Sequence, residues 1–148
     1  SAVSTINQSA FHNTRFTGTL TIPATVTTMG TSVFRDSTGF RRVVFEEGFK
    51  LIPESTFQNC TGVVEVVIPS SVTQINGSAF FNCTSLGTVY VDSPTIAGLL
   101  TARNSCGNLL YNALTVYVST SASSSLPSSF FNIFTETTST VSGYKKYT

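Results

Sequence analysis

The chain has 148 residues, and eight lysines and arginines against seven aspartates and glutamates give it a formal charge of +1. Charged residues make up only 10% of the sequence, which excludes a broad basic surface for nucleic acid or an anionic membrane. No apolar run approaches the roughly 20 residues that a membrane-spanning helix needs. We therefore expect a single domain over residues 1–148 without membrane insertion.

A 23-residue repeat runs through most of this domain. Its clearest marker is a phenylalanine that stands two residues after a serine in four consecutive units, at Phe11, Phe34, Phe57 and Phe80. Apolar residues recur at fixed offsets around each phenylalanine, as expected for a repeat architecture. The repeat units are about 1–23, 24–46, 47–69, 70–92 and 93–118, with a C-terminal cap at 119–148.

The start of the chain falls inside the first unit and lacks both an initiator methionine and the features of a signal peptide. We therefore expect a mature segment or a piece of a longer protein, and the position inside a repeat favours the piece.

Each unit contains one segment of alternating apolar and polar residues, such as Thr19–Ile22 in the first unit and Glu65–Ile68 in the third. This alternation predicts a short strand with one buried face. Pro23 and Pro69 follow two of these segments and cannot donate to a strand ladder, so they end the strands. Helix propensity is low between the strands. We expect a mainly β solenoid with about five short parallel strands spaced about 4.8 Å apart, and non-helical turns on the opposite side.

The fifth unit departs from this pattern. Arg103 replaces the phenylalanine, although Cys106 and Leu109 remain in register with the fourth unit. The strand-like segment 115–120 then copies 88–93 with a shift of 27 residues, so about four residues are inserted between Leu109 and Thr115. The repeat array therefore ends here.

A cap is expected after the last strand, because the end of a repeat stack would otherwise expose its apolar core. Residues 123–136 fit an amphipathic helix, with Ser125 as a cap and Pro127 in the first turn. Its apolar face would consist of Leu126, Phe130, Ile133 and Phe134. We predict a small C-terminal cap helix in this segment.

The three cysteines, Cys60, Cys83 and Cys106, lie one repeat apart. Stacked at the strand spacing, they would lie farther apart than the roughly 3.8 Å between Cβ atoms that a disulfide prefers. The sequence also lacks the further ligands of a tetrahedral zinc site. We expect buried free thiols that pack as small hydrophobic residues, no metal and no cofactor.

Other reactive residues give little support to an enzyme. His12 is the only histidine, so neither a Ser-His-Asp triad nor a two-histidine metal site can form. Glu46 and Glu47 are neighbours at a strand end, where a solvated edge is favoured over acid–base catalysis. Asp36, Asn59 and Asn82 share one repeat position, and we expect their side chains to bond backbone groups of a turn. Four Asn-X-Ser/Thr sequences, at Asn7, Asn59, Asn76 and Asn82, match the N-glycosylation acceptor.

The outward positions of the strands are the best candidates for binding. One exposed row is predicted to contain Thr21, Val44, Val67, Tyr90 and Tyr117, and the row beside it Thr19, Arg42, Glu65, Thr88 and Thr115. Valine and tyrosine facing solvent indicate a contact surface, and tyrosine is a favoured anchor. The alternative is that β-branched and aromatic residues simply suit strands.

The segment "IPSSVTQINGSAFFNCTSLGTVYV" at 68–91 resembles the BspA-like leucine-rich repeat, a 23-residue variant of the leucine-rich repeat, and the resemblance extends over about residues 3–118. Departures include Phe49, the Glu46 and Asp92 that replace a usual proline, and the fifth unit. The resemblance implies a right-handed solenoid with a strand-lined face, in a protein exposed on a cell surface or secreted. It also implies adhesion to host proteins, matrix or other cells, without enzymatic activity.

These observations predict a non-enzymatic extracellular or cell-surface module that binds a protein or a glycan. The predicted ligand-binding residues are Thr21, Arg42, Val44, Glu65, Val67, Thr88, Tyr90 and Tyr117. Nucleic acid is not an expected partner. The alternative is a structural spacer within a larger surface protein, with end-to-end self-association through the N-terminal rung.

Overall fold

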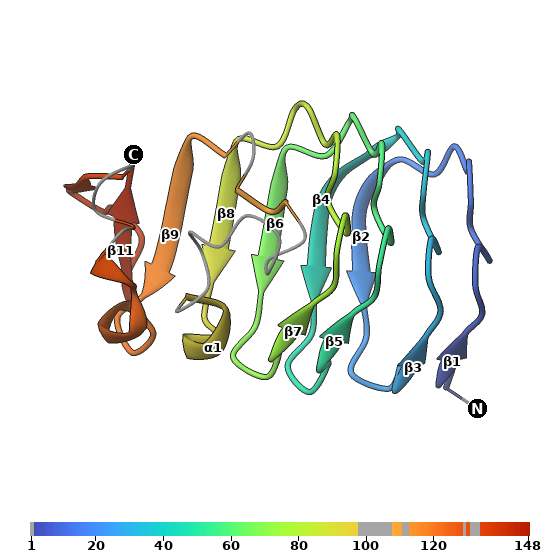
Figure 1. Ribbon diagram of the computed structural model, residues 1–148, viewed down its shortest axis with the longest axis horizontal. Coiled ribbons are helices and arrows are strands. Elements are labelled where there is room, and N and C mark those ends of the chain that lie inside the picture. Colours follow the sequence, from blue (N-terminus) through green and yellow to red (C-terminus); the bar gives the residue numbers. More distant parts are fainter. Residues whose placement is uncertain (1, 98–107, 111–112, 129, 131–133) are drawn as a thin grey trace.

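The computed structural model describes residues 2–97, 108–110, 113–128, 130 and 134–148. They form a β-solenoid in which each repeat unit makes one rung, and the two ends of the chain lie at opposite ends of the long axis (Figure 1). The main sheet contains seven strands in the order β10-β11-β9-β8-β6-β4-β2. The expected solenoid is therefore confirmed.

Five parallel strands build most of this sheet, as the alternation predicted. They are β2 (Gly18–Ile22), β4 (Phe40–Phe45), β6 (Glu65–Ile68), β8 (Thr88–Val91) and β9 (Thr115–Ser119). From β4 to β8 the paired residues are 23 apart, as in Val43 with Val66, and from β8 to β9 they are 27 apart, as in Val89 with Val116. The insertion in the fifth unit thus leaves the strand register intact.

Short strands form a second row on the other side of the solenoid, where only turns were expected. They are β1 (Thr5–Ile6), β3 (Thr28–Met29), β5 (Leu51–Ile52) and β7 (Gln74–Ile75), paired as β1-β3 and β5-β7. Between residues 5 and 83 the structure contains no helix, which confirms the non-helical turns. We call this side of the molecule the turn side.

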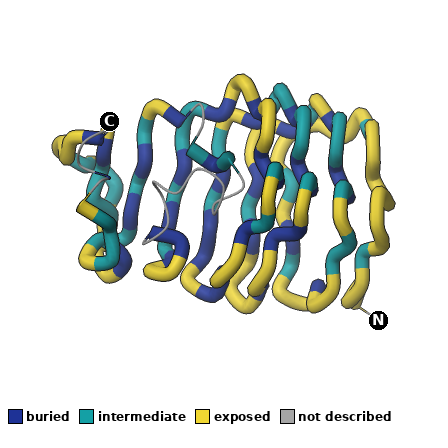
Figure 2. The backbone as a smooth tube through the Cα atoms, in the orientation of Figure 1, coloured by how far each residue is buried: buried dark blue, intermediate teal, exposed yellow. Residues whose placement is uncertain are grey.

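The repeated phenylalanines stack into a continuous spine through the core. The ring centroids of Phe11 and Phe34 are 5.4 Å apart, those of Phe34 and Phe57 5.3 Å, and those of Phe57 and Phe80 5.4 Å, with interplanar angles of 6°, 12° and 7°. Phe57 and Phe80 are fully buried, whereas Phe11 in the first rung is 36% exposed. Figure 2 shows the same gradient along the chain, since the N-terminal rung is mostly exposed whereas buried residues recur along the strands of the middle rungs.

A four-residue helix, α1 (Pro94–Ala97), follows β8 where the repeat would continue into turns. Ser93 begins it, because the Ser93 hydroxyl accepts a hydrogen bond from the Ile96 N–H at 3.2 Å. Pro94 suits the first helical position, where its missing N–H leaves no intrahelical bond unmade. In the sequence, the Ser93–Pro94 pair was the signal that could have predicted the start of this helix. Arg103 and Cys106 lie outside the described residues.

The cap helix predicted over 123–136 falls partly on residues that the structure does not describe. The described part of that segment begins with a single 3-10 turn, η1 (Ser123–Ser125), after which Leu126 is extended at φ −62° and ψ 130°. The residue before a proline is disfavoured in the helical region, so η1 ends before Pro127. A further turn starts at Pro127, as expected, because its carbonyl accepts from the Phe130 N–H at 2.9 Å and the Phe130 carbonyl accepts from the Phe134 N–H at 3.0 Å. Residues 129 and 131–133, which include the predicted contact Ile133, lie outside the described residues.

A β-hairpin closes the main sheet at this end. Strand β11 (Tyr144–Tyr147) pairs antiparallel with β9, and β10 (Glu136–Thr137) pairs antiparallel with β11. The buried Tyr147 ring packs edge-on against Phe130 at 5.1 Å. Because β11 pairs antiparallel with β9, the sheet does not end in another parallel rung.

Candidate functional site

The outward side of the main sheet, which we call the strand face, is the candidate binding surface. The first predicted row is in register, since Thr21 pairs with Val44, Val44 with Val67, Val67 with Tyr90, and Tyr90 with Tyr117. The second row, Thr19, Arg42, Glu65, Thr88 and Thr115, is aligned in the same way. Thr21 and Arg42 are exposed and the other predicted ligand-binding residues are half-buried. The structure therefore brings the predicted residues together on one surface, and their role in binding stays a prediction.

Charges on this face are balanced at its centre. Arg42 and Glu65 are neighbours on β4 and β6, and the Arg42 guanidinium donates a hydrogen bond to the Glu65 carboxylate. Both side chains are partly exposed, so the pair contributes at most about 1 kcal/mol to stability. The pair leaves no net charge at this point of the face.

Tyrosines form a cluster at the C-terminal end of the strand face. The rings of Tyr90 and Tyr117 stack at 4.6 Å with an interplanar angle of 9°, and Tyr144 meets Tyr90 edge-on at 5.5 Å and 86°. Burial and the nearby Glu65 carboxylate raise the pKa of Tyr90, while burial and the hydrogen bond to Asp92 raise the pKa of Tyr144. These two phenols stay protonated at neutral pH. The Tyr90 hydroxyl can donate a hydrogen bond to a ligand, whereas the Tyr144 hydroxyl already donates its proton to Asp92 and can accept from a ligand.

The hairpin adds residues to this face that the sequence analysis did not identify. Lys146 lies directly opposite Tyr117, and Tyr144 lies opposite Ser119, so both extend the strand face onto β11. Tyr144 and Tyr147 were a weak signal for a strand, because tyrosine is enriched in strands, although the segment does not alternate. This signal could not indicate pairing with β9.

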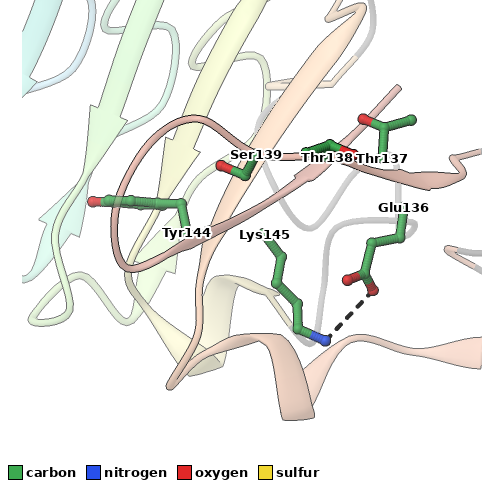
Figure 3. A pocket seen from close by; sticks show the side chains of 6 residues that line it. All are labelled: Glu136, Thr137, Thr138, Ser139, Tyr144 and Lys145. Carbon is green, nitrogen blue, oxygen red and sulfur yellow. Dashed lines mark hydrogen bonds and ion pairs between the residues drawn. The ribbon is translucent and has the colours of Figure 1, made fainter.

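The hairpin of β10 and β11 borders an open, polar hollow of about 690 Å³. Figure 3 shows its lining residues, Glu136, Thr137, Thr138, Ser139, Tyr144 and Lys145. The Lys145 ammonium lies 3.4 Å from the Glu136 carboxylate, and the Tyr144 ring extends away from this pair. Its only charged groups are paired, and its remaining polar groups are hydroxyls.

The cysteine ladder is structural in the two units that the structure describes. Cys60 and Cys83 are buried free thiols, and each Sγ donates a hydrogen bond of 3.1 Å to a phenylalanine carbonyl of the preceding rung, at Phe34 and Phe57. Ser37 occupies the same repeat position and donates in the same way to the Phe11 carbonyl at 3.0 Å. Burial raises the pKa of Cys60 from 9.0 to about 12 and raises the pKa of Cys83 further. Both thiols are therefore protonated and unreactive at neutral pH.

The Asn/Asp position forms a ladder of side chains on the turn side. The Asn82 side-chain amide donates to the Asn59 Oδ1 at 3.0 Å, and the Asn59 side-chain amide donates to the Asp36 carboxylate at 2.7 Å. These side chains were expected to bond backbone groups of a turn, and this expectation is wrong for the bonds between rungs. The Asn59 and Asn82 side chains instead bond the side chain at the same repeat position in the preceding rung. All three residues have positive φ, between +59° and +62°, a region in which Asn and Asp are enriched.

His12 ends this ladder at its N-terminal side. It lies in a turn, as predicted, with Nε2 2.9 Å from the Asp36 carboxylate. Hydrogen bonds from Asn59 and His12 and the Arg35 charge hold the pKa of Asp36 below its usual value, against partial desolvation. The histidine therefore has a structural partner.

The two adjacent carboxylates also connect rungs. Glu46 accepts a hydrogen bond from the Ala24 N–H at 3.0 Å, and Glu47 accepts from the Ser70 hydroxyl at 2.8 Å and its N–H at 3.1 Å. Glu46 therefore bonds toward the N-terminal end of the solenoid and Glu47 toward the C-terminal end. Among the described residues, no group of three or more His, Cys, Asp or Glu side chains could hold a metal ion. In the same part of the chain, no helix is long and apolar enough to cross a membrane.

Comparison with protein families identifies the repeat. Residues 1–102 match the family model described as the BspA type leucine rich repeat region, with six copies. No curated protein matches the chain.

Two solved structures share the fold. A leucine rich cell surface protein from Faecalibacterium prausnitzii A2-165 matches with a TM-score of 0.65 and 23% identity, over 85% of this chain and 33% of that one. A leucine-rich repeat protein from Eubacterium ventriosum ATCC 27560 matches with a TM-score of 0.56 and 16% identity, over 97% of this chain and 39% of that one. The chain thus spans well under half the length of these proteins.

Proposed function

The chain belongs to the BspA type leucine rich repeat family, and from this we propose that it is a non-enzymatic binding module of a cell-surface or secreted protein. In this proposal the strand face mediates adhesion by binding a protein or a glycan. The likeness to a cell surface protein of F. prausnitzii supports the location. The proposal includes no cofactor, because the cysteines, the histidine and the carboxylates described above have structural partners.

The tyrosine cluster is the observation that carries this proposal. Tyr90, Tyr117 and Tyr144 gather three aromatic side chains at one end of the strand face, whereas the other end has threonine in both rows at Thr19 and Thr21. Tyrosine offers a large contact area and a hydrogen-bonding hydroxyl at a low cost in side-chain entropy. Clustered aromatic residues are also where interfaces concentrate their binding energy.

The experiment begins with a pull-down from extracellular host material to identify a partner, followed by affinity measurements with purified protein. We expect Tyr90→Ala with Tyr117→Ala to weaken binding by about thirtyfold or more, as for a loss of at least about 2 kcal/mol. The melting temperature should change little, because both rings are only half-buried on the outer side of the sheet.

Phe81→Ala is the matched control for this experiment. Phe81 is 45% exposed, and it follows the spine residue Phe80 on the turn side, away from the strand face. Its loss should leave the affinity unchanged. Unaltered binding by the double tyrosine variant, or an equal loss in Phe81→Ala, would contradict the assignment of the strand face.

A structural spacer is the second candidate, and the N-terminal rung favours it. Val3 is 60% exposed and Phe16 56% exposed, and Phe16 packs edge-on against the partly exposed Phe11 at 6.1 Å. Strand β2 is the last strand of the main sheet at this end, so its outward N–H and C=O groups can pair with another strand. An apolar end with an open strand edge suits packing against a further protein unit.

For the spacer we expect the purified chain to self-associate through this rung, with a molar mass in light scattering that rises with concentration. Phe16→Ser should reduce the association, because it removes an exposed apolar side chain from the rung. Phe81→Ser, an equal change on the turn side, should not reduce it. A monomer at high concentration would count against this candidate.

A further inference from the structure

We propose that Asn76 is a site of spontaneous modification, at which the main chain of Gly77 converts the side-chain amide into aspartate and isoaspartate. Asn76–Gly77 is the only Asn-Gly pair in the sequence. The pair lies directly after β7 (Gln74–Ile75), on the turn side. This proposal is independent of the strand face and of any ligand.

The reaction needs an accessible main-chain nitrogen after the asparagine. Gly77 is exposed, and a side-chain carbon added to it would have no atom within 4 Å. Among the described residues, the Gly77 N–H has no hydrogen-bond partner, whereas its carbonyl accepts from the Ser55 N–H at 3.2 Å. The attacking nitrogen is therefore unshielded and not engaged in the ladder between rungs.

The amide that is attacked is also polarised. The Gln74 Nε2 donates a hydrogen bond of 2.6 Å to the Asn76 Oδ1. A donor on this oxygen draws electrons from Cγ and stabilises the negative charge that develops on the oxygen during attack. Gln74 is exposed, so it can be replaced without disturbing the core.

The chemistry balances with water as the only co-reactant. The Gly77 nitrogen loses its proton to hydroxide and attacks the Asn76 Cγ, which forms a five-membered succinimide. The bond from Cγ to Nδ2 breaks, and the nitrogen takes up a proton and leaves as ammonia. Water then opens the ring. Opening at the side-chain carbonyl leaves aspartate, and opening at the main-chain carbonyl leaves isoaspartate.

The first rung contains an internal control for this reaction. Asn7 occupies the same repeat position, and its carbonyl accepts from the Ala10 N–H at 3.2 Å, as the Asn76 carbonyl accepts from the Ala79 N–H at 3.3 Å. The local turn is therefore alike in the two rungs. Asn7 is followed by Gln8, which has a side chain where Gly77 has none. The Gln8 nitrogen also lies close to Gly30 in the next rung, since a carbon added to Gly30 would be 2.4 Å from it.

Isoaspartate would alter the contact between two rungs. The Asn76 N–H donates to the Ile52 carbonyl at 2.9 Å, and the Gly77 carbonyl accepts from Ser55. An extra methylene group in the main chain between these two bonds changes their spacing, so they cannot both keep their geometry. The aspartate product adds only a negative charge. The isoaspartyl form should therefore melt at a lower temperature than Asn76→Asp.

The test is incubation of the folded protein in mildly alkaline buffer, with peptide mass mapping and enzymatic methylation of isoaspartyl groups as readouts. We expect Asn76 to convert at least about tenfold faster than Asn7, a difference of about 1.4 kcal/mol or more in the barrier. Gly77→Ala should slow the conversion of Asn76, and Gln8→Gly should make Asn7 convert. Gln74→Met should slow the reaction at Asn76.

Three results would overturn the proposal. They are retention of the Asn76 amide while other asparagines convert, an equal rate in Gly77→Ala, and conversion of Asn76 only after the protein is unfolded in urea. An unchanged rate in Gln74→Met would remove the activating role assigned to Gln74. Circular dichroism of each variant before incubation shows that the comparison is between folded proteins.

Discussion

Phe57→Ala is expected to lower the free energy of unfolding by about 3 to 5 kcal/mol, the range for removing a large aromatic side chain from a core. Phe57 is fully buried. Its ring is stacked between Phe34 at 5.3 Å and Phe80 at 5.4 Å, and it meets Phe45 edge-on at 6.0 Å. Alanine would leave a cavity in the middle of the spine, which neither neighbouring rung can fill without losing its own stacking. Urea denaturation followed by circular dichroism measures the loss.

Phe11→Ala is the matched control, since it removes the same side chain from the same repeat position. Phe11 is partly exposed and has a spine neighbour on one side only, Phe34. We expect its loss to cost less than about 2 kcal/mol. Equal losses for Phe11→Ala and Phe57→Ala would contradict a spine in which each rung is stabilised by neighbours on both sides.

Gly62→Ala is expected to destabilise the protein by about 2 to 3 kcal/mol or more, because the new side chain would collide with main chain. A carbon added to Gly62 would lie 1.9 Å from the Thr38 carbonyl oxygen and 3.0 Å from that of Phe40. Gly39, one repeat earlier, has the same close approach to the Phe16 carbonyl oxygen at 2.2 Å. Because the atoms in the way are backbone, relief requires two rungs to move apart. Thermal and urea denaturation measure the effect.

Gly77→Ala tests whether this cost comes from the close approach of rungs or from any loss of glycine. An added carbon at Gly77 meets open space, and Gly77 is not among the glycines with positive φ. We expect a change within about 0.5 kcal/mol. A small effect at Gly62, or similar effects at both glycines, would rule out the predicted clash.

Much of the fold could be predicted from local sequence. The interval between Phe34, Phe57 and Phe80 places like side chains one above another, and their stacked rings confirm that expectation. The alternation in each unit correctly predicted five parallel strands, even across the four-residue insertion before β9. These features could be predicted because each rung packs mainly against its neighbours, so the same short sequence pattern recurs in every unit.

The features that could not be predicted depend on partners distant in sequence. The segment 123–136 was expected to close the stack, but no local pattern indicated that the hairpin of β10 and β11 would join the main sheet at this end. The Asn59 side chain was expected to bond a turn, but its partner is Asp36 in another rung. A periodic pattern shows which residues share a face and does not show what covers that face.

The candidate binding surface also has a part that could be predicted from local sequence and a part that could not. The sequence alone determined the aligned rows of the strand face, including Tyr90 and Tyr117, because repeat spacing dictates the parallel register. Only the tertiary structure decided that Tyr144 and Lys146 join them, since β11 pairs antiparallel with β9. Pairing of an antiparallel edge strand depends on backbone hydrogen bonds that almost any sequence can form, so neither its partner nor its direction is written in the side chains.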